Sequence, residues 1–349
     1  MIDLGAAGHR SPAAALEPPF ASVARVCAIV GAAVAAPSVH NTQPWRFHCA
    51  DDTTMELYAD LDRLLTATDP MGRGLGISCG AALLNLRLAV RATGHDAHVR
   101  LLPRPADRPD LLATVHAVPG APPDPDERLL HEMIPHRRTN RFPFDGRPVA
   151  REVMVGLVHA AHAEGATLVP VAGRTARRVL DLVAMADDTL SDDPAYRAEL
   201  AAWTGTDARA AWTGTDARPD GVPEHAFGPR PRDGRVPMRD FAPGRRQAEA
   251  DFEAEPQLAA LFTRGDGPRD WLRAGQALQR VLLTATAKGV AASLFSQPLD
   301  LRPAQHRGDV TGPFGHVQML IRLGYGPPVP RVPRRPVPDV LDGREAPGA

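Results

Sequence analysis

The 349-residue chain has very little lysine and no excess of either charge. Its 40 basic residues face 41 acidic ones, and Lys288 is the only lysine, so arginine supplies nearly all of the positive charge. A net charge of -1 creates no global field that would attract nucleic acid or an anionic membrane. Any anion site is therefore expected to be local, and we expect neither a nucleic-acid nor a membrane partner.

Cysteine and long hydrophobic runs are also scarce. The three cysteines, Cys27, Cys49 and Cys79, have no C-x-x-C spacing and lie among apolar or small residues, which favours reduced core thiols over redox or metal roles. The N-terminus has no basic region followed by an apolar one, and the apolar run 26–36 is far shorter than the ~20 residues of a membrane span. We expect a cytoplasmic protein.

One stretch is typical of a rigid polar loop. Residues 36–47 read APSVHNTQPWRF, and the two prolines and several small polar side chains disfavour both helix and strand. The preceding segment 20–36 has apolar residues three and four positions apart, which predicts a helix stopped by Pro37. Such a loop, with polar side chains and amides turned outward, suits a flat ligand with polar edges.

The remaining pattern predicts short strands between helices. Alternating apolar residues predict a hairpin around Asp51 and Asp52, and the glycine-rich segment 71–80 is expected to precede a helix. The expected strands are 45–49, 55–59, 98–102, 111–118, 167–171 and 316–326, and the expected helices are 81–93, a short one ending at 134, 150–164 and 175–189. Residues 203–246, rich in Gly, Pro, Asp and Arg, are expected to be an irregular lid or a disordered segment.

The chain contains two internal repeats. The nonapeptide AAWTGTDAR occurs in tandem at 201–209 and 210–218; because nine residues turn a helix by two and a half turns, it is tolerable only in a loop or at a helix end. Segments Gly80–Gly94 and Gly275–Gly289 are amphipathic, end in glycine and share six identities. That likeness fits either two copies of one α+β unit or chance similarity between alanine-rich helices.

Three other patterns suggest different chemistry. The G-x-S-x-G at 76–80 would need a strand before it to act as a hydrolase nucleophile, and 71–75 is glycine-rich instead. His159 and His162 share a predicted helix but lack H-E-x-x-H or a carboxylate pair, so no metal site is predicted. No G-x-G-x-x-G follows a predicted strand, which disfavours a dedicated dinucleotide site.

A basic cluster begins the second half of the chain. Arg137, Arg138 and Arg141, with Thr139 among them, precede a predicted helix. A phosphate group binds guanidinium groups, hydroxyls and the free amides of a helix start. Of the 40 basic residues one is lysine, so 39 are arginines, and clusters of arginine are common in this chain. The alternative interpretation is therefore that this cluster lies on a solvated surface.

Read together, four motifs resemble the FMN-dependent nitroreductase family. They are the loop A-P-S-x-x-N-x-Q-P-W, the R-R-x-x-R segment, Q-x-x-L-L-x-A-x-x-x-G-x-x-x-S at 279–293, and L-G-Y-G followed by R-R-P. Over residues 20–341 the chain is most similar to the Acg-type subfamily. This resemblance implies an α+β fold of two tandem pseudo-symmetric halves that form an intrachain pseudo-dimer. The implied parts are a flexible tail (1–19), half 1 (20–134), half 2 (135–330, with the lid or insertion at 203–246) and a C-terminal arm (331–349).

The resemblance also assigns residues to an FMN site. The phosphate and ribityl chain would be held by Arg137, Arg138, Thr139 and Arg141, with Arg334 and Arg335 approaching from the arm. The isoalloxazine would contact Pro37, Ser38, His40 and Asn41, together with the segment 294–297, represented by Ser296. Gln43 and Trp45 would fix the loop rather than touch the ligand. No catalytic side chain is expected, because the flavin N5 would perform the chemistry.

The implied activity is NAD(P)H-dependent reduction of nitroaromatics, quinones or similar small electrophiles by a ping-pong mechanism, with NADPH or NADH as a transient donor. The alternative is a non-catalytic protein that sequesters flavin under a lid. No R-R-x-x-R precedes the first loop, because the helix before it reads ARVCA at 24–28, so one FMN per chain is expected. A monomer is expected because one chain would supply both sides of the usual dimer interface.

Overall fold

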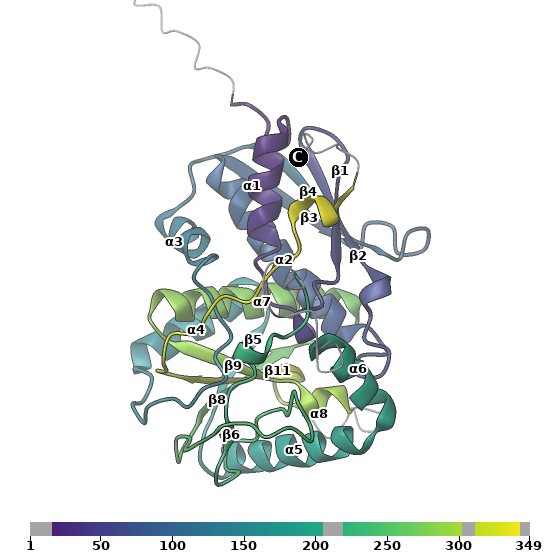
Figure 1. Ribbon diagram of the computed structural model, residues 1–349. Helices are drawn as coiled ribbons and strands as arrows, with labels where there is room; N and C mark the ends of the chain where they lie inside the picture. Colours follow the sequence, from purple (N-terminus) through teal and green to yellow (C-terminus); the bar gives the residue numbers. More distant parts are fainter. Residues whose placement is uncertain (1–15, 205–218, 302–310, 343–349) are drawn as a thin grey trace, which may run out of the picture.

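The computed structural model describes residues 16–204, 219–301 and 311–342, in which two β-sheets enclose a pair of long helices (Figure 1). The α-helices are α1 (Val23–Ala33), α2 (Arg73–Ala92), α3 (Pro125–Met133), α4 (Arg151–Ala163), α5 (Gly173–Asp192), α6 (Pro194–Thr204), α7 (Pro268–Ala287) and α8 (Gln297–Asp300). The strands are β1 (Trp45–Cys49), β2 (Thr54–Ala59), β3 (His95–Leu101), β4 (Leu111–Pro119), β5 (Thr167–Val171), β6 (Arg230–Pro231), β7 (Glu249–Ala250), β8 (Gln257–Thr263), β9 (Ala291–Phe295), β10 (Thr311–Gly312), β11 (Gly315–Gly324) and β12 (Leu341–Asp342).

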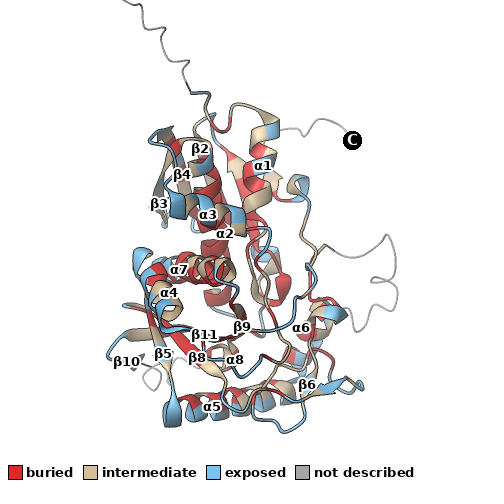
Figure 2. Ribbon diagram, turned by 90° about the vertical axis from the view of Figure 1, so that its left-hand side faces the viewer, coloured by how far each residue is buried: buried red, intermediate tan, exposed pale blue. Residues whose placement is uncertain are grey.

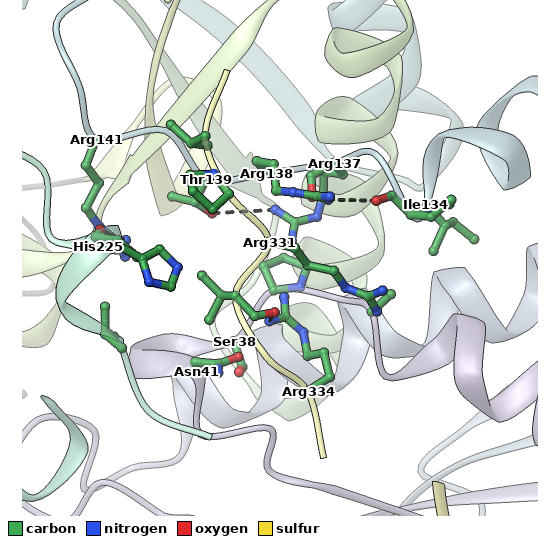
Figure 3. A pocket seen from close by; sticks show the side chains of 18 of the residues that line it. Ser38, Asn41, Ile134, Arg137, Arg138, Thr139, Arg141, His225, Arg331 and Arg334 are labelled. Atoms are coloured by element: carbon green, nitrogen blue, oxygen red, sulfur yellow. Dashed lines mark hydrogen bonds between the residues drawn. The ribbon is translucent and has the colours of Figure 1, made fainter. Parts of the chain in front are cut away.

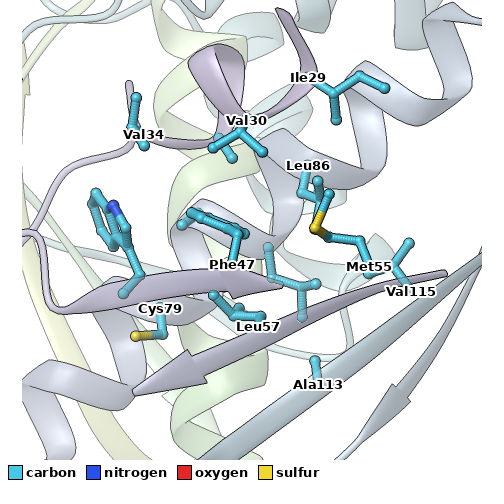
Figure 4. Packing of buried hydrophobic residues seen from close by; sticks show 14 of the residues in the cluster. Ile29, Val30, Val34, Phe47, Met55, Leu57, Cys79, Leu86, Ala113 and Val115 are labelled. Carbon is cyan, nitrogen blue, oxygen red and sulfur yellow. The ribbon is translucent and has the colours of Figure 1, made fainter. Parts of the chain in front are cut away.

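The first sheet has the strand order β12-β1-β2-β4-β3. β1 and β2 form the predicted hairpin, with Phe47 opposite Leu57, and β4 pairs antiparallel with both β2 and β3. One face of this sheet packs against α1 and α2, where Phe47, Leu57 and Leu86 have no exposed surface (Figure 4). Period-two alternation therefore marked these strands because one face is buried and the other is not.

The second sheet repeats this order with strands from later in the chain. β5 pairs with β8, β8 with β11, and β11 with β9, all antiparallel, so both sheets follow the order first, second, fourth, third. In each sheet a 20-residue helix connects the second strand to the third, α2 in one and α7 in the other. The two units thus share strand order, pairing direction and the placement of the long helix.

The two repeat segments found in the sequence meet at the centre of the molecule. They form much of α2 and α7, which pack against each other between the sheets (Figure 1). At Gly80 and Gly275 the backbones approach so closely that a Cβ atom on either glycine would overlap a backbone oxygen of the other helix. Nearby, the buried Gln279 amide donates to Asn85 Oδ1 at 2.8 Å. Both predicted terminal glycines, Gly94 and Gly289, adopt positive φ.

Helix α2 begins earlier than the sequence predicted. The glycine-rich segment 71–80 was expected to precede a helix over 81–93, yet the helix starts at Arg73 because Gly76 and Gly80 allow α7 to pack closely. Within the described residues α2 is the one helix long and apolar enough to cross a membrane by length and composition. Of its most apolar 18-residue window 83% is buried inside the protein, which is the environment of a core helix (Figure 2).

Between β5 and β8 the chain makes a long excursion. α5 covers the face of the second sheet opposite α7, with Leu180 and Val183 against Leu258 and Phe262. The segment 219–246 is irregular, as predicted, apart from the short β6 and the 3-10 helix Glu224–Ala226. The sequence did not predict α6 or β8. Most of the tandem nonapeptide lies outside the described residues; its first copy begins in the last turn of α6.

The end of the chain returns to the first sheet. After β11 an extended segment runs to the 3-10 helix Val337–Asp339, and β12 then pairs in parallel with β1, Leu341 beside Phe47. Val340 is completely buried in the first core. This arm therefore passes from the second sheet to the first and lies between them beside the loop that follows α1 (Figure 1).

Candidate functional site

The loop after α1 is held in an uncommon backbone conformation. His40, Asn41 and Gln43 have φ values of 47, 55 and 51°, and they are three of the four non-glycine residues with positive φ in the described chain. Ser38 Oγ accepts the Gln43 amide at 2.9 Å, and Ser78 Oγ of α2 accepts the Val39 amide at 3.3 Å. Strain of this kind persists only where the surroundings impose it, and it is concentrated at functional sites.

Gln43 and Trp45 fix this loop from behind. The Gln43 side chain donates to Pro219 O at 2.8 Å and accepts the Arg335 amide at 2.7 Å, so it joins the loop to the excursion and to the arm. Trp45 is completely buried in the first core. Neither side chain lines the cavities described below.

The basic segment 137–141 runs along the edge of the second sheet. Thr139 forms a parallel bridge with Ala292 of β9, and the Asn140 amide donates to Ala292 O at 2.8 Å. The prediction that this cluster lies at a helix start was wrong, because α4 begins only at Arg151. The strand edge, rather than a helix terminus, sets the direction of these side chains.

A cavity brings together the loop, the basic segment and the arm (Figure 3). Its polar lining includes Ser38 and Asn41 from the loop, Arg137, Arg138, Thr139 and Arg141 from the basic segment, His225 from the excursion, and Arg331 and Arg334 from the arm. These segments are far apart in the sequence. In Figure 3 Arg137 and Arg138 lie near Arg331 and Arg334 of the arm, whereas Arg141 lies on the other side of the cavity beside His225.

The arginines in this cavity lack acidic partners. Among the described residues, none of the carboxylates forms an ion pair with Arg137, Arg138, Arg141, Arg331 or Arg334. Burial, followed by the charge of Arg138, lowers the pKa of Arg137 to about 10. Burial and the charges of Arg137, Arg331 and Arg138 lower the pKa of Arg334 to about 9. Arg137 is buried, Arg138, Arg141 and Arg334 are partly buried, and Arg331 is exposed. A cluster of like charges without counterions among the described residues can bind an anion.

A second cavity adjoins the first and shares Pro37, Ser38, Thr139 and Arg141 with it. One wall is apolar and comes from α2, α7 and β9, including Ile77, Leu278 and Leu294. His40, Ser296 and Gln297 contribute polar groups, and Met238, Arg239 and Phe241 of the excursion complete the lining. The guanidinium of Arg141 lies 4.7 Å from the centre of the Phe241 ring. Together the two cavities form a basic end joined to a largely apolar slot.

Arg239 is the functional candidate that the sequence did not reveal. Its guanidinium donates to His40 Nε2 at 2.9 Å, Tyr196 Oη at 3.0 Å, Ser296 Oγ at 3.1 Å and Asp300 Oδ2 at 2.8 Å. Burial opposes its charge, but Tyr196, Asp300 and Asp187 outweigh this and raise the pKa of Arg239 above its ordinary value. One side chain of the excursion thus contacts the loop, α6 and the β9–α8 junction.

The structure separates Arg335 from the other predicted site residues. Arg335 lines neither cavity; its guanidinium pairs with Asp60 at 3.1 Å and donates to Gln43 O at 3.3 Å. Arg334 and Arg335 are consecutive in an extended segment, where neighbouring side chains point to opposite sides. Arg334 therefore faces the cavity and Arg335 faces away, so we no longer expect Arg335 to hold a phosphate.

The remaining predicted residues lie at the two cavities. Pro37 and Ser38 line both, Asn41 lines the first, and His40 and Ser296 line the second. The side-chain amide of Asn41 donates from Nδ2 to Gly221 O at 2.9 Å, so Asn41 also anchors the excursion.

Two alternative chemistries lose support. Ser78 of the G-x-S-x-G motif lies inside α2 and donates to Gly74 O at 2.7 Å, so the motif has no preceding strand and is not a nucleophile elbow. Within the described part of the chain, no group of three or more His, Cys, Asp or Glu residues could hold a metal ion.

Comparison with known proteins gives the family. No protein-family model matches the chain. Two Mycobacterium tuberculosis (strain H37Rv) proteins, Rv3131 and acg, both bear the name "Putative NAD(P)H nitroreductase". The chain is 34% identical to Rv3131 over 341 residues, covering 95% of each chain, and 31% identical to acg over 317 residues, covering 88% of this chain and 92% of acg.

Among solved structures, the chain is similar to the FMN-dependent nitroreductase NfnB of Mycobacterium smegmatis in complex with NADPH. The match covers 63% of this chain and 98% of NfnB, with 18% sequence identity and a TM-score of 0.38. The full-length sequence identity to the two mycobacterial proteins carries the conclusion. The chain belongs to the nitroreductase family.

Proposed function

We propose that this chain binds FMN across the two cavities and is an NAD(P)H-dependent oxidoreductase of the nitroreductase type. The observation that carries the proposal is the arginine cluster around the buried Arg137, which has no counterion among the described residues and lies at the end of a largely apolar slot. A flavin mononucleotide has the matching shape, with an anionic phosphate at one end and a flat ring system at the other.

The residues present fit this cofactor. The Nε atoms of Arg137 and Arg334 are buried and have no hydrogen-bond partner among the described residues, so both can donate to a phosphate. Thr139 and Ser38, in the wall shared by the cavities, would face the ribityl chain. The apolar wall beside Ile77, Leu278 and Leu294 would exclude water from the ring.

The chain's part in the reaction is binding, orientation and electrostatics. Bound FMN supplies hydride chemistry between NAD(P)H and a nitroaromatic, quinone or similar small electrophile. Arg137 and Arg334 would hold the phosphate, and Arg141 would keep a positive charge beside the slot. Neutral His40 and the loop amides would orient the ring edge.

We further propose that the chain is a fusion of two nitroreductase-like halves and acts as a monomer. The shared strand order and the α2–α7 contact support the fusion. A second, symmetry-related cofactor site would need a loop between α4 and β5, but the chain turns there within 164–166. Glu164 instead pairs with Arg87 at 2.5 Å and Arg280 at 2.7 Å. We therefore expect one FMN per chain.

A second candidate function is flavin sequestration. The excursion lies over both cavities, with His225 and Ala226 at the first and Met238, Arg239 and Phe241 at the second. We propose that this segment acts as a lid. A lid that stays closed would retain flavin and exclude the electrophile.

The flavin spectrum during anaerobic addition of NADPH tests both functions. Rapid bleaching of the bound flavin, followed by recovery on adding a quinone, is expected for the reductase. A yellow protein whose spectrum never changes would support sequestration instead. A protein that neither retains nor takes up FMN would contradict both.

A further inference from the structure

The second cavity contains one unpartnered polar atom from each of two buried side chains. His40 Nδ1 and Gln297 Oε1 have no hydrogen-bond partner among the described residues. Water hardly reaches them, because His40 is only 6% exposed and Gln297 only 1% exposed. Both residues line this cavity, His40 from the loop after α1 and Gln297 from the start of α8. A buried polar atom without a partner costs about 1–3 kcal/mol, which a ligand can recover.

The contacts of His40 determine which ring nitrogen carries the proton. Arg239 Nη1 lies 2.9 Å from His40 Nε2, and a guanidinium can only donate. Nε2 must therefore accept, and a neutral ring then carries its hydrogen on Nδ1. Burial, followed by the charges of Arg239 and Arg141, lowers the pKa of His40 well below 6.5, which keeps the ring neutral. His40 consequently presents an N–H donor to the cavity.

The contacts of Gln297 fix its amide in the opposite sense. Its Nε2 donates to Asp187 Oδ1 of α5 at 3.3 Å, so the nitrogen is turned toward the carboxylate and Oε1 is left free. Ser296 and Asp300 hold the neighbouring turn, since Ser296 Oγ donates to Asp300 Oδ2 at 2.8 Å. Gln297 consequently presents an acceptor to the same cavity.

We propose that His40 Nδ1–H and Gln297 Oε1 together recognise the imide edge of a ligand. The imide carbonyl accepts a hydrogen bond from His40, and the adjacent imide N–H donates one to Gln297. Arg239 is the positioning residue that sets the His40 tautomer. This inference rests on the proposed function, in which the imide edge is that of the isoalloxazine pyrimidine ring. The excursion then belongs to the cofactor site itself, because it supplies Arg239.

Flavin analogues test the pair directly. Flavin-stripped protein would be titrated with FMN and with 3-methyl-FMN, whose methyl group removes the N–H, and dissociation constants measured by quenching of flavin fluorescence. We expect 3-methyl-FMN to bind about tenfold more weakly or worse, since one buried acceptor is left unpaired. Gln297→Leu should weaken FMN binding and abolish this discrimination. Equal binding of both flavins by the wild-type protein would overturn the proposal, whereas failure to bind FMN at all would overturn the proposed function instead.

The tautomer has a separate readout. Nitrogen-15 NMR of His40 in the flavin-free protein should show a protonated Nδ1 and an unprotonated Nε2. Arg239→Met should shift the ring toward the Nε2–H form, while Arg147→Met, which removes an exposed arginine stacked on Tyr325 outside both cavities, should leave it unchanged. Protonated Nε2 in the wild-type protein, or no response to Arg239→Met, would refute the role of Arg239.

Discussion

Replacing Arg137 with Met should make the flavin-free protein more stable than flavin-free wild type. In the presence of FMN the order should reverse, and the variant should be less stable than wild type. Arg137 is 4% exposed and has no carboxylate partner in the described chain. Burial, followed by the charge of Arg138, lowers its pKa from the ordinary value of arginine to about 10. At about 1.4 kcal/mol per pH unit, that difference corresponds to a penalty of about 3 kcal/mol for keeping the guanidinium charged in the folded protein.

The sign of this effect follows from proton linkage. The pKa of Arg137 is lower in the folded chain than in the unfolded one, so the penalty is fully present at neutral pH and is relieved only as the pH rises above about 10 toward the ordinary pKa of arginine. Methionine keeps much of the apolar stem but carries no charge. We therefore expect Arg137→Met to raise the free energy of unfolding of flavin-free protein by about 1–3 kcal/mol at pH 7.

FMN should reverse the order of the two proteins. At a thousand times its dissociation constant, FMN stabilises the wild type by about 4.1 kcal/mol, and the variant should gain almost nothing. Urea unfolding of both proteins, with and without FMN, measures the reversal. Arg335→Met is the matched control: it breaks the contact with Asp60 and should lower stability equally in both conditions. If flavin-free Arg137→Met is less stable than wild type, Arg137 is not an unpaired charge awaiting an anion.

Three further changes test the fold and the site. Gly275→Ala should lower the free energy of unfolding by about 2 kcal/mol because it pushes α7 from α2, whereas Gly156→Ala in open space on α4 should raise it by about 1 kcal/mol; denaturant titration compares the two. FMN affinity should fall as the pH rises above about 9, because Arg334 of the flavin-free protein then becomes uncharged and attracts the phosphate less strongly. An FMN dissociation constant that does not change from pH 8 to 10.5 would argue against Arg334 as a phosphate ligand. Glu164→Gln should destabilise the protein by about 2 kcal/mol by leaving Arg87 and Arg280 without their anion, yet FMN titration should still give one cofactor per chain.

Much of the first sheet could be predicted because its strands have one buried face. Phe47 and Leu57 alternate with polar neighbours, which marks a strand in the sequence. In contrast, β8 reads QLAALFT and is packed on both faces, by α7 on one side and α5 on the other, so it has no alternation to detect. The start of α2 was missed because glycine lowers helix propensity, and only the contact with α7 explains its presence.

The residues of the candidate site could likewise be predicted only in part. The loop with Ser38 and His40 and the cluster with Arg137 could be found because local patterns mark them. Arg239 could not, since it is one of many arginines and lies in an irregular segment whose position depends on contacts with α6 and α8. The side to which Arg334 points also depends on the path of the arm, which no local pattern fixes.

One chain should bind one FMN between its loop, basic segment and arm. Native mass spectrometry of flavin-stripped protein after addition of FMN measures chain number and cofactor number together. We expect a single chain with a single FMN, and a single chain without FMN for the variant carrying both Arg137→Ala and Arg141→Ala. Two FMN molecules per chain, or undiminished FMN binding in the double variant, would contradict this expectation.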